Sequence, residues 1–502
     1  MSSNEMNMDR IPAEKFEFVQ LNDKIHDKRL ETKPVGFLQD AMIRFSQNRG
    51  SVVCAIILLI LILYAIFGPI ISNYSIDEKD GYYQYVLPKI SDKFDLGFWN
   101  GCSKKEFTQA QYDMLDATPG AVRKFLGTET RMIAAKEQTV YKVLVDSYAR
   151  RGYIEVLLDK SQIAKALKYE QETGIQLFYP AIDRDQIVCQ PYKADPNAWF
   201  KTNQKGIAER DADGNLIPLY LEGEDDYINA SYDDKIDRDH NLIYFRKMQG
   251  DNQYQARILY SDWYYYKNGK TACFWFGADE FGYDIFTRLG AGARLSFLLS
   301  MTAAIVDLII GIIVGSCEGY YGGWFDLFME RFKEIISEVP SVVFITLFQL
   351  YFAKKHGSLL VFWVTLVVFG WMGVSGTVRA QFYRFKGMEY VMAARTLGAK
   401  DSRLIFRHIL PNASGFIITS SVLLIPSVIF SESTYSFLGI VNLNSRYLTS
   451  VGAMLSNGQT TLTTYPHCLF FPAIFISILL ICFNIFGNGL RDAFNPVLRG
   501  SN

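Results

Sequence analysis

Apolar residues are concentrated in six long runs, which polar segments separate. The first run, residues 51–71 (SVVCAIILLILILYAIFGPII), carries no charge and is long enough to cross a hydrocarbon core of roughly 30 Å. Comparable runs follow at residues 295–317, 335–353, 358–378, 414–439 and 466–488. This pattern predicts an α-helical polytopic membrane protein with six transmembrane helices.

One polar segment, residues 379–408 between the fourth and fifth runs, is strongly basic. Its acidic residues are Glu389 and Asp401. Its basic residues are Arg379, Arg384, Lys386, Arg395, Lys400, Arg403 and Arg407. Because cytoplasmic loops carry an excess of Lys and Arg, we expect this segment in the cytoplasm. Six spans then place both termini in the cytoplasm and the long segment between the first two spans outside.

The runs divide the chain into four parts. Residues 1–50 are predicted to be a cytoplasmic tail, 51–71 the first transmembrane helix, 72–274 an inserted extracytoplasmic domain, and 275–502 a core holding transmembrane helices two to six. Residues 1–35 read as a poorly ordered tail. The next apolar positions fall on one face of a helix: Phe37, Leu38, Ala41, Met42 and Phe45. This helix either lies on the inner membrane surface or extends the first span into the cytoplasm.

The inserted domain is predicted to be α+β. Residues 136–158 place Val140, Val143, Leu144 and Tyr148 on one helical face. Residues 241–248 (NLIYFRKM) and 254–266 (YQARILYSDWYYY) favour strands, and 211–216 (DADGNL) favours a turn. The aromatic cluster in the second stretch fits a ligand platform, an interfacial belt or plain packing; it comprises Tyr260, Trp263, Tyr264, Tyr265 and Tyr266.

Motifs for catalysis are missing from the sequence. Gly269, Lys270 and Thr271 resemble the end of a phosphate-binding loop, but Tyr264 stands where that loop requires glycine. The five histidines form no metal-binding pair, and no GxSxG nucleophile elbow occurs. The net charge of −1 gives no indication of a nucleic-acid partner. We therefore expect no enzyme activity and neither cofactor nor metal in this chain.

The basic segment contains two predicted short helices. Tyr390, Ala394 and Leu397 share one face of the first, and Gly398 is suited to end it. Asp401 or Ser402 is expected to cap the second, which Pro411 would end. The second helix has an apolar side of Leu404, Ile405 and Ile409 and a basic side of Arg403 and Arg407. Such helices could contact a cytoplasmic partner or lie on the inner leaflet with their arginines at lipid phosphates.

This segment resembles the EAA motif of ABC importer permeases. From about residue 275 onward the chain is similar to the C-type permease subunit of the oligopeptide, dipeptide and nickel importers. The stretches that carry the resemblance are WFGADEFGYDIFTRLGAGARLS, GYYGGWFD, SESTYSFLGI and NIFGNGLRDAFNPVLRG, with FLQDAMIRFSQNRGSVV similar to the family's N-terminal elbow. Two departures stand out: Met392 occupies the position of the motif's glutamate, and the segment between the first two spans is far longer than in the family.

The resemblance implies a permease subunit of a type I ABC importer, with oligopeptides or dipeptides as the first expected cargo. Nickel or another small solute is an alternative, and a membrane sensor with an extracellular ligand-binding domain is an alternative of another class. Implied partners are a homologous second permease, two cytoplasmic ATPases that bind ATP and magnesium, an extracellular binding lipoprotein and membrane lipid. The implied coupling loop spans 379–412, with Glu389, Met392, Ala393, Ala394, Gly398, Arg403, Arg407 and Pro411 as its site residues.

Three acidic residues lie inside predicted spans, where a carboxylate is costly. They are Asp307, Glu338 and Glu432. Each is a candidate for lining a pathway or meeting a partner permease. For Glu338, which stands two residues before Pro340, a position at the aqueous end of the third span is equally compatible with the sequence.

Overall fold

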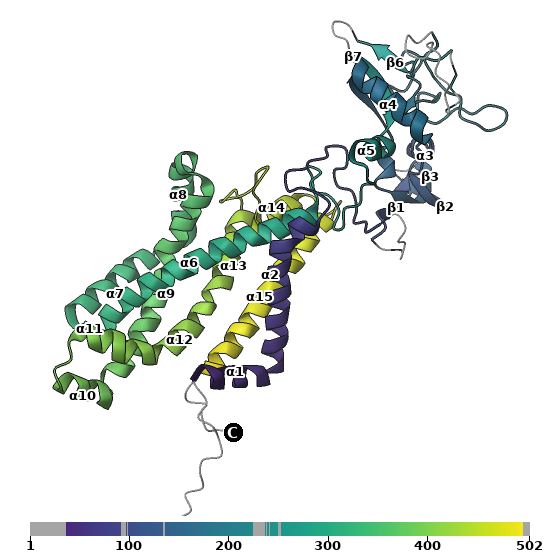
Figure 1. The fold of residues 1–502 in the computed structure, drawn as a ribbon. Helices are drawn as coiled ribbons and strands as arrows, with labels where there is room; N and C mark the ends of the chain where they lie inside the picture. Colours follow the sequence, from purple (N-terminus) through teal and green to yellow (C-terminus); the bar gives the residue numbers. More distant parts are fainter. Residues whose placement is uncertain are drawn as a thin grey trace, which may run out of the picture.

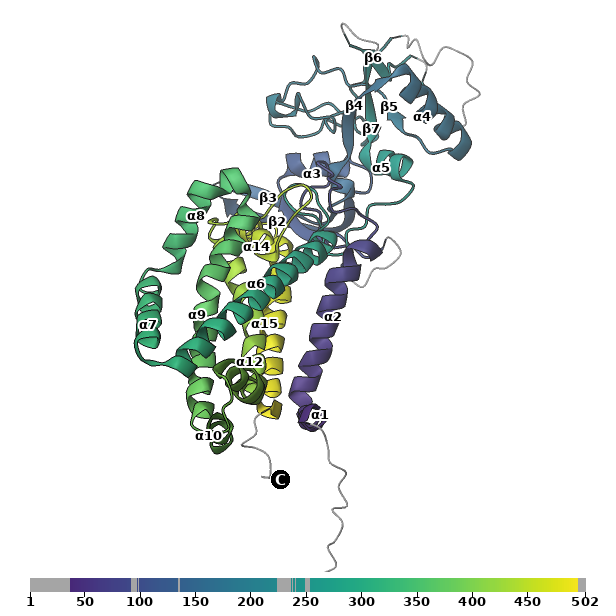
Figure 2. The same cartoon turned by 60° about the vertical axis from the view of Figure 1, so that its left-hand side comes forward.

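The protein consists of a helical bundle with an α+β domain at one end (Figure 1). The computed structural model describes residues 37–91, 97, 99–133, 136–223, 236, 238, 239, 241–248 and 253–494. The predicted tail, residues 1–35, lies outside these described residues. In the turned view, α1 and α10 lie at the same end of the bundle, and the α+β domain lies at the other (Figure 2).

Among the described residues, five helical segments are long and apolar enough to cross a membrane by themselves. They are α2 (Arg49–Ile71), α6 (Ile285–Tyr321), α9 (Ser358–Lys386), the run Asp401–Phe437 and α15 (His467–Phe494). The helices α7 (Gly323–Ser337) and α8 (Ser341–His356) give a sixth span if counted as one. The polytopic α-helical fold predicted from the sequence is confirmed.

The predicted third span is wrong in one respect, because it is a bent pair and not one continuous helix. Helices α7 and α8 meet at an angle of 74° within residues 335–353. Pro340 forms the N-cap of α8. Proline cannot donate a backbone hydrogen bond and disfavours helical geometry in the residue before it, so the helix ends at this point.

The fifth span is also built from several pieces. It contains α11 (Asp401–Arg403), the π-helical turn η5 (Leu404–Ile409), α12 (Leu410–Val422) and α13 (Leu424–Phe437). Before it lies α10 (Glu389–Thr396), and after it α14 (Val451–Thr460). The chain therefore enters the membrane from a short, sharply turned segment.

Helices α6 and α9 pack closely along a row of glycines. A side chain added at Gly311 would come within 2.5 Å of Val374, and one at Gly315 would collide with the carbonyl oxygen of Ser375. Small residues allow helix backbones to approach in lipid, where helix association gains little from the hydrophobic effect. This pair forms the centre of the bundle.

The N-terminal helix α1 (Phe37–Gln47) packs against the end of α15. Ala41 and Phe45 are buried, and the Phe45 ring meets Phe486 edge-on with centroids 5.6 Å apart. Met42, which was predicted on the same apolar face, is 57% exposed. The helix predicted at this position is present, with a narrower packed face than expected.

The outer domain contains two antiparallel sheets. The first has the order β1-β3-β2, from β1 (Cys102–Phe107), β2 (Val122–Ile133) and β3 (Lys136–Asp146). The second has the order β4-β7-β5 with β6 also paired to β7, from β4 (Tyr153–Asp159), β5 (Phe178–Tyr179), β6 (Phe245–Lys247) and β7 (Gln253–Leu259). Its helices are α3 (Gln109–Asp116), α4 (Lys160–Thr173) and α5 (Tyr260–Asn268), with 3₁₀ turns at η3 (Ala149–Arg151) and η4 (Gln190–Tyr192).

The helix predicted over residues 136–158 is wrong, because this stretch forms β3, a 3₁₀ turn and β4. Val143 and Val145 point to the same side of β3 and are buried. β-branched and aromatic side chains fit a pleated sheet, and the pairing of β3 with β1 and β2 satisfies its backbone. The strand predicted over 254–266 is correct only as far as Leu259, after which α5 begins.

The turn predicted at residues 211–216 is present. Gly214 has φ of +85°, a left-handed conformation that glycine adopts without strain, and its N–H donates to the Asp211 carbonyl at 3.1 Å. An isolated bridge joins Arg210 to Leu216 across it.

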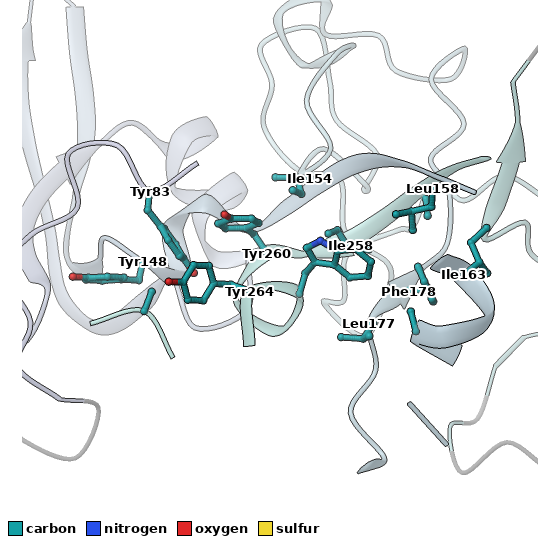
Figure 3. Close-up of a cluster of buried hydrophobic side chains, with 14 of the residues drawn as sticks. Tyr83, Tyr148, Ile154, Leu158, Ile163, Leu177, Phe178, Ile258, Tyr260 and Tyr264 are labelled. Atoms are coloured by element: carbon teal, nitrogen blue, oxygen red, sulfur yellow. The ribbon is translucent and has the colours of Figure 1, made fainter. Parts of the chain in front are cut away.

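The aromatic cluster of α5 is a packing element. Tyr260, Trp263 and Tyr264 are buried, whereas Tyr265 is 40% exposed. The ring of Tyr83, from the segment after α2, lies 4.8 Å from Tyr260 and 5.3 Å from Tyr264 between centroids. Figure 3 shows these rings continuing into the aliphatic core of the domain. The cluster therefore joins the outer domain to the chain that leaves the membrane.

Candidate functional site

The loop between α9 and α12 lies at the end of the bundle away from the outer domain (Figure 1). Helix α10 ends at Thr396, and Gly398, two residues later, has a φ of +83°. The Ala399 N–H donates to the Ala394 carbonyl at 3.1 Å, and the Gly398 N–H donates to the Arg395 carbonyl at 3.0 Å. A left-handed residue combined with a hydrogen bond that spans five residues, here from Ala399 to Ala394, is a common way for a helix to end. The predicted role of Gly398 as a helix stop agrees with this geometry.

One side of α10 packs on the membrane helices. Val391 is buried and Ala394 is partly buried, in a cluster with Phe382, Leu404 and Ile409. Of the residues predicted to share one face with Ala394, Tyr390 is 40% and Leu397 88% exposed. Leu397 forms the C-cap and lies outside the helical periodicity.

The loop also exposes large apolar side chains. Met392 is 57% exposed, Leu397 88% and Phe406 62%. Glu389, Ala393, Arg403 and Arg407 are also exposed. The loop therefore exposes three large apolar side chains, Met392, Leu397 and Phe406, together with arginines.

The second short helix predicted here is the start of the fifth span. Lys400, and not Asp401 or Ser402, is the N-cap. Leu404, Ile405 and Ile409 are buried as predicted. Pro411 does not end this helix, which continues into α12 after the π-helical turn η5. The π turn changes the backbone hydrogen-bond pattern just before Pro411. The helix can therefore continue although proline has no N–H to donate.

A polar link that the sequence prediction missed holds the loop to α6. The Tyr320 hydroxyl donates to Asp401 Oδ1 at 2.5 Å, and Arg395 Nη2 donates to the Tyr320 hydroxyl at 3.2 Å. Tyr320 itself is buried. The tyrosine lies in the stretch GYYGGWFD, which carries part of the family resemblance but has no recognisable chemistry of its own. Through Tyr320, α6 contacts both α10 and the start of the fifth span.

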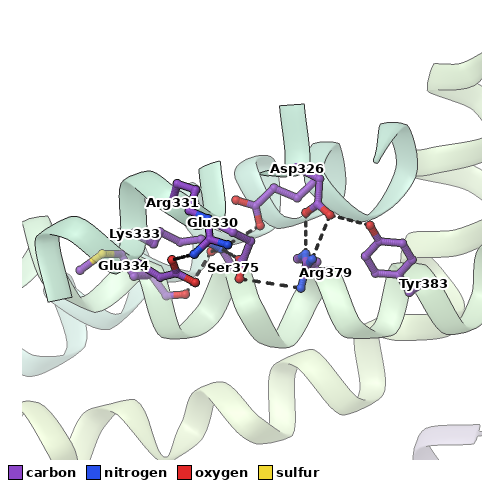
Figure 4. A network of polar contacts seen from close by, with 10 residues as sticks. Asp326, Glu330, Arg331, Lys333, Glu334, Ser375, Arg379 and Tyr383 are labelled. Carbon is purple, nitrogen blue, oxygen red and sulfur yellow. Dashed lines mark hydrogen bonds and ion pairs between the residues drawn. The ribbon is translucent and has the colours of Figure 1, made fainter. Parts of the chain in front are cut away.

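A second polar network, also missed, joins α7 to α6 and α9 (Figure 4). Lys333 Nζ lies 3.0 Å from Glu318 Oε2 and 3.2 Å from Ser375 Oγ. Arg379 donates two hydrogen bonds to Asp326, at 2.5 and 2.9 Å, and the Tyr383 hydroxyl donates to the same carboxylate at 2.6 Å. The Glu318 and Lys333 side chains are at most 9% exposed. The bent helix is therefore held to the central pair by buried charges.

The three acidic residues predicted inside spans have different surroundings. Glu432 is buried and accepts hydrogen bonds from Ser296 Oγ at 3.0 Å and Ser436 Oγ at 3.1 Å. Asp307 is buried against the backbone of Gly370, where a side chain added at the glycine would collide with the carboxylate. Glu338 is the exposed C-cap of α7 at the corner with α8. The structure does not bring these three residues together.

The described residues contain no group of three or more His, Cys, Asp or Glu side chains that could hold a metal ion. The features that the structure brings together are thus an exposed loop surface, a polar link to α6 and a charged contact with α7. These are mechanical connections between helices, suited to transmitting movement.

Two family models match the chain. Residues 307–500 match the binding-protein-dependent transport system inner membrane component, and residues 36–88 match the N-terminal TM domain of oligopeptide transport permease C. The intervening residues 89–306, which include the outer domain, fall outside both matches.

Curated relatives agree with these matches. The chain is 44% identical over 225 residues to the oligopeptide transport system permease protein OppC of Bacillus subtilis (strain 168), covering 45% of this chain and 72% of that protein. It is 40% identical over 226 residues to the dipeptide transport system permease protein DppC of the same organism, covering 45% and 69%. A solved structure of the methionine ABC transporter MetNI in an inward-facing conformation aligns with a TM-score of 0.32 and 12% identity, covering 41% of this chain and 96% of that one.

The extent and identity of these matches confirm the family resemblance predicted from the sequence. Members of the family are integral proteins of bacterial membranes and imply a partner ATPase and a substrate-binding protein. Homologues of this kind are transport subunits and not enzymes. The chain belongs to the C-type permease subunits of the oligopeptide and dipeptide ABC importers.

Proposed function

We propose that the chain forms half of the translocation pathway of an ATP-driven peptide importer, together with a homologous second permease. Oligopeptides or dipeptides are its cargo, as the names of its relatives suggest. Two ATPase subunits bind ATP and magnesium, and this chain binds neither. A binding lipoprotein delivers the peptide from outside the cell.

The observation that carries the proposal is the exposure of three large apolar side chains on one short loop, Met392, Leu397 and Phe406. Several large apolar side chains exposed on a polar loop are typical of a protein-binding surface. The loop is connected to α6 through Tyr320 and to the fifth span through the chain itself. Movement of an ATPase bound to this loop would therefore reach two membrane helices, as coupling between two states requires.

These exposed apolar side chains also support packing as the main contact to the ATPase. Met392 replaces the family's acidic residue, and Glu389, one turn earlier, is exposed and available as a substitute. We favour packing because Met392 is itself a large exposed apolar side chain and the same loop exposes Leu397 and Phe406. Glu389→Gln should then leave peptide-stimulated ATP hydrolysis unchanged in the reconstituted complex. If this substitution instead abolishes the stimulation of ATP hydrolysis, the coupling contact belongs to Glu389.

The arrangement of the bundle supports one orientation of the chain in the membrane. Helices α1 and α10 lie at one end and the outer domain at the other (Figure 2). With the basic loop in the cytoplasm, both termini are cytoplasmic, the host membrane is the plasma membrane, and the outer domain faces the binding protein. Deleting residues 80–265 should weaken association of the binding protein and leave ATPase docking intact; unchanged peptide delivery would argue against docking by this domain.

The direct test is purification of the chain from its native membrane. Co-purification of ATPases and a second permease is the expected result, and a chain that purifies alone counts against the proposal. Leu397→Asp should reduce peptide-stimulated ATP hydrolysis by about tenfold or more, because it buries a charge at an apolar contact. Leu397→Met, which keeps an apolar side chain, is the matched control and should retain activity.

A further inference from the structure

The strand β4 lies at the edge of its sheet, with β7 as its neighbour among the described strands. The Tyr153 N–H donates to Asn197 Oδ1 at 2.7 Å, and Asn197 Nδ2 donates to the Tyr153 carbonyl at 3.4 Å. The backbone groups of Tyr153 therefore point away from β7. Because these groups alternate in direction along an antiparallel strand, Glu155 and Leu157 also direct theirs to the open edge.

Both ends of this open edge are covered by side chains. Asn197 occupies the start, and at the far end Gln162 Oε1 accepts the Asp159 N–H at 3.0 Å. Within the described residues, the outward N–H and C=O groups of Glu155 and Leu157 make no backbone hydrogen bond. Unpaired edge groups are a template for an added strand, and an edge of two such residues suits a short one.

Two hollows lie along this edge. The larger, of about 1100 Å³, is lined by Tyr153 and by Thr464, Tyr465 and Pro466 of the loop before α15. The smaller, of about 700 Å³, is lined by residues 154–158 and the start of α5. Tyr82, Ile154 and Glu155 line both. An extended ligand on the edge would thus have space along β4 for its side chains.

The larger hollow carries positive charge that acids within it do not neutralise. Its cations are Lys104, Lys105, Arg150 and Arg151, and none of them forms an ion pair within the described part of the chain. The two acidic residues are already engaged: Glu155 pairs with Arg184 at 2.5 Å, and Asp195 accepts the Asn197 N–H at 2.9 Å.

Lys105 is the most enclosed of these cations. Burial, with a smaller contribution from the nearby Arg150, lowers the pKa of Lys105. Its ammonium group also lies 5.9 Å from the centre of the Tyr465 ring. A bound carboxylate would compensate this partly desolvated charge.

We propose that the β4 edge binds a short peptide in extended conformation, antiparallel to β4, with its C-terminal carboxylate among Lys105, Arg150 and Arg151. Arg150 and Arg151 lie just before β4, separated from it by Gly152, so the antiparallel direction brings the carboxylate toward them. Backbone hydrogen bonds to Glu155 and Leu157 would hold peptides of many sequences. This inference rests on the proposed function and adds a substrate-holding site on the outer domain.

The test uses the full chain in lipid nanodiscs and three probes: tetraalanine, its C-terminal amide and a backbone N-methylated tetraalanine. Tetraalanine should bind at least about tenfold more tightly than the amide, since hydrogen bonds to charged groups are the stronger ones. The N-methylated peptide should not bind. Equal affinity of acid and amide, or binding of the N-methylated peptide, overturns the proposal.

Variants of the chain give an independent test. Lys105→Ala with Arg150→Ala should lower the affinity for tetraalanine to that for the amide and leave amide binding unchanged. Leu157→Pro removes one outward N–H and should abolish binding, whereas Leu157→Ala, which keeps that N–H, should retain it. Hydrogen exchange of the other β4 amides checks that the strand is intact. Retained binding by Leu157→Pro with β4 intact contradicts the site.

Two further measurements distinguish a peptide site at β4 from a docking surface and from the proposed function. If the purified binding protein, but no tetraalanine, binds in a way that Arg150→Ala abolishes, the edge is a docking surface for that protein and the peptide site is overturned. ATP-driven uptake by the assembled complex is measured separately. Uptake without binding at β4 overturns this inference alone, and binding at β4 without uptake supports it while overturning the proposed function.

Discussion

The membrane core and the outer domain use opposite kinds of residue where their elements meet. In the core, α6 and α9 approach through glycines such as Gly311 and Gly315. In the outer domain, the large rings of Tyr83, Tyr260 and Tyr264 fill the interior. Helices in lipid gain little from burying apolar area, so their association depends on close contact between their backbones. In water, by contrast, a buried aromatic ring stabilises the fold by removing a large apolar area from solvent. One chain follows two packing rules because its two parts have different solvents.

The largest effect is expected at the buried charge pair of the core. Lys333→Met leaves the Glu318 carboxylate, whose side chain is fully buried, without its partner. Loss of one member of a buried pair costs about 3–5 kcal/mol. The thermal unfolding midpoint of the purified chain in detergent should therefore fall strongly.

Two further variants test this interpretation. Lys354→Met removes an exposed lysine from α8 and should change the midpoint little. Adding Glu318→Gln to Lys333→Met removes the stranded charge and should recover part of the loss. If both lysine variants unfold at the same temperature, charge pairing does not distinguish the core.

Tyr83→Ala addresses the outer domain. Tyr83 is 2% exposed, and truncation of a buried aromatic side chain costs about 3–5 kcal/mol. Limited proteolysis should cleave the outer domain faster while the membrane helices stay protected. Tyr265→Ala, at a ring 40% exposed, is the control. If Tyr83→Ala made the outer domain and the membrane helices equally sensitive to the protease, the two parts would unfold as one unit.

Gly315→Ala is expected to have a smaller effect on the core. The added methyl group meets the Ser375 carbonyl oxygen, and overpacking of this kind costs about 1–3 kcal/mol. Gly373→Ala on α9 has open space around the added group and should be neutral or slightly stabilising. Both are measured by thermal unfolding in detergent, and a harmless Gly315→Ala would contradict close backbone packing.

The smallest effect concerns two outer carboxylates with opposite pKa shifts. Burial raises the pKa of Asp262 in the folded state. Its contribution to the free energy of unfolding is therefore present below the pKa of the unfolded state and is lost as the pH rises through the pKa of the folded state. Hydrogen bonds from Gln162 and Ser161 lower the pKa of Asp159, whose contribution is lost as the pH falls through its folded value. Asp262→Asn should raise and Asp159→Asn should lower outer-domain stability near pH 7, as followed by proteolysis. Shifts in the same direction would refute the assignment.

The membrane fold could be predicted because bilayer thickness dictates the length of an apolar run. The strands of residues 136–158 could not, since Val140, Val143 and Leu144 satisfy a helical period while Val143 and Val145 satisfy a strand period. Pairing with β1 and β2 decides between them, and these partners lie elsewhere in the sequence. Tertiary context therefore overrode local pattern in the outer domain.

The loop between α9 and α12, for which we propose a coupling role, could be predicted in position and partly in shape. Gly398 is identifiable because few residues adopt its backbone conformation, whereas the effect of Pro411 depended on the π turn before it. The Tyr320 link and the Lys333 network join residues on different helices, such as Asp326 and Arg379. Sequence spacing reveals no such partners, since helix packing alone brings them together.

The two chain segments that enter and leave the outer domain lie side by side next to the membrane helices. The ring of Tyr74, just after α2, stacks on that of Phe274, just before α6, with centroids 4.5 Å apart. Nearby, the Ser72 hydroxyl donates to the Asp284 carboxylate that caps α6. The insertion thus begins and ends at nearly one point, so its size places no demand on the spacing of the spans. A permease core built this way can carry an outer module, or exchange it for another, without rearranging a single membrane helix.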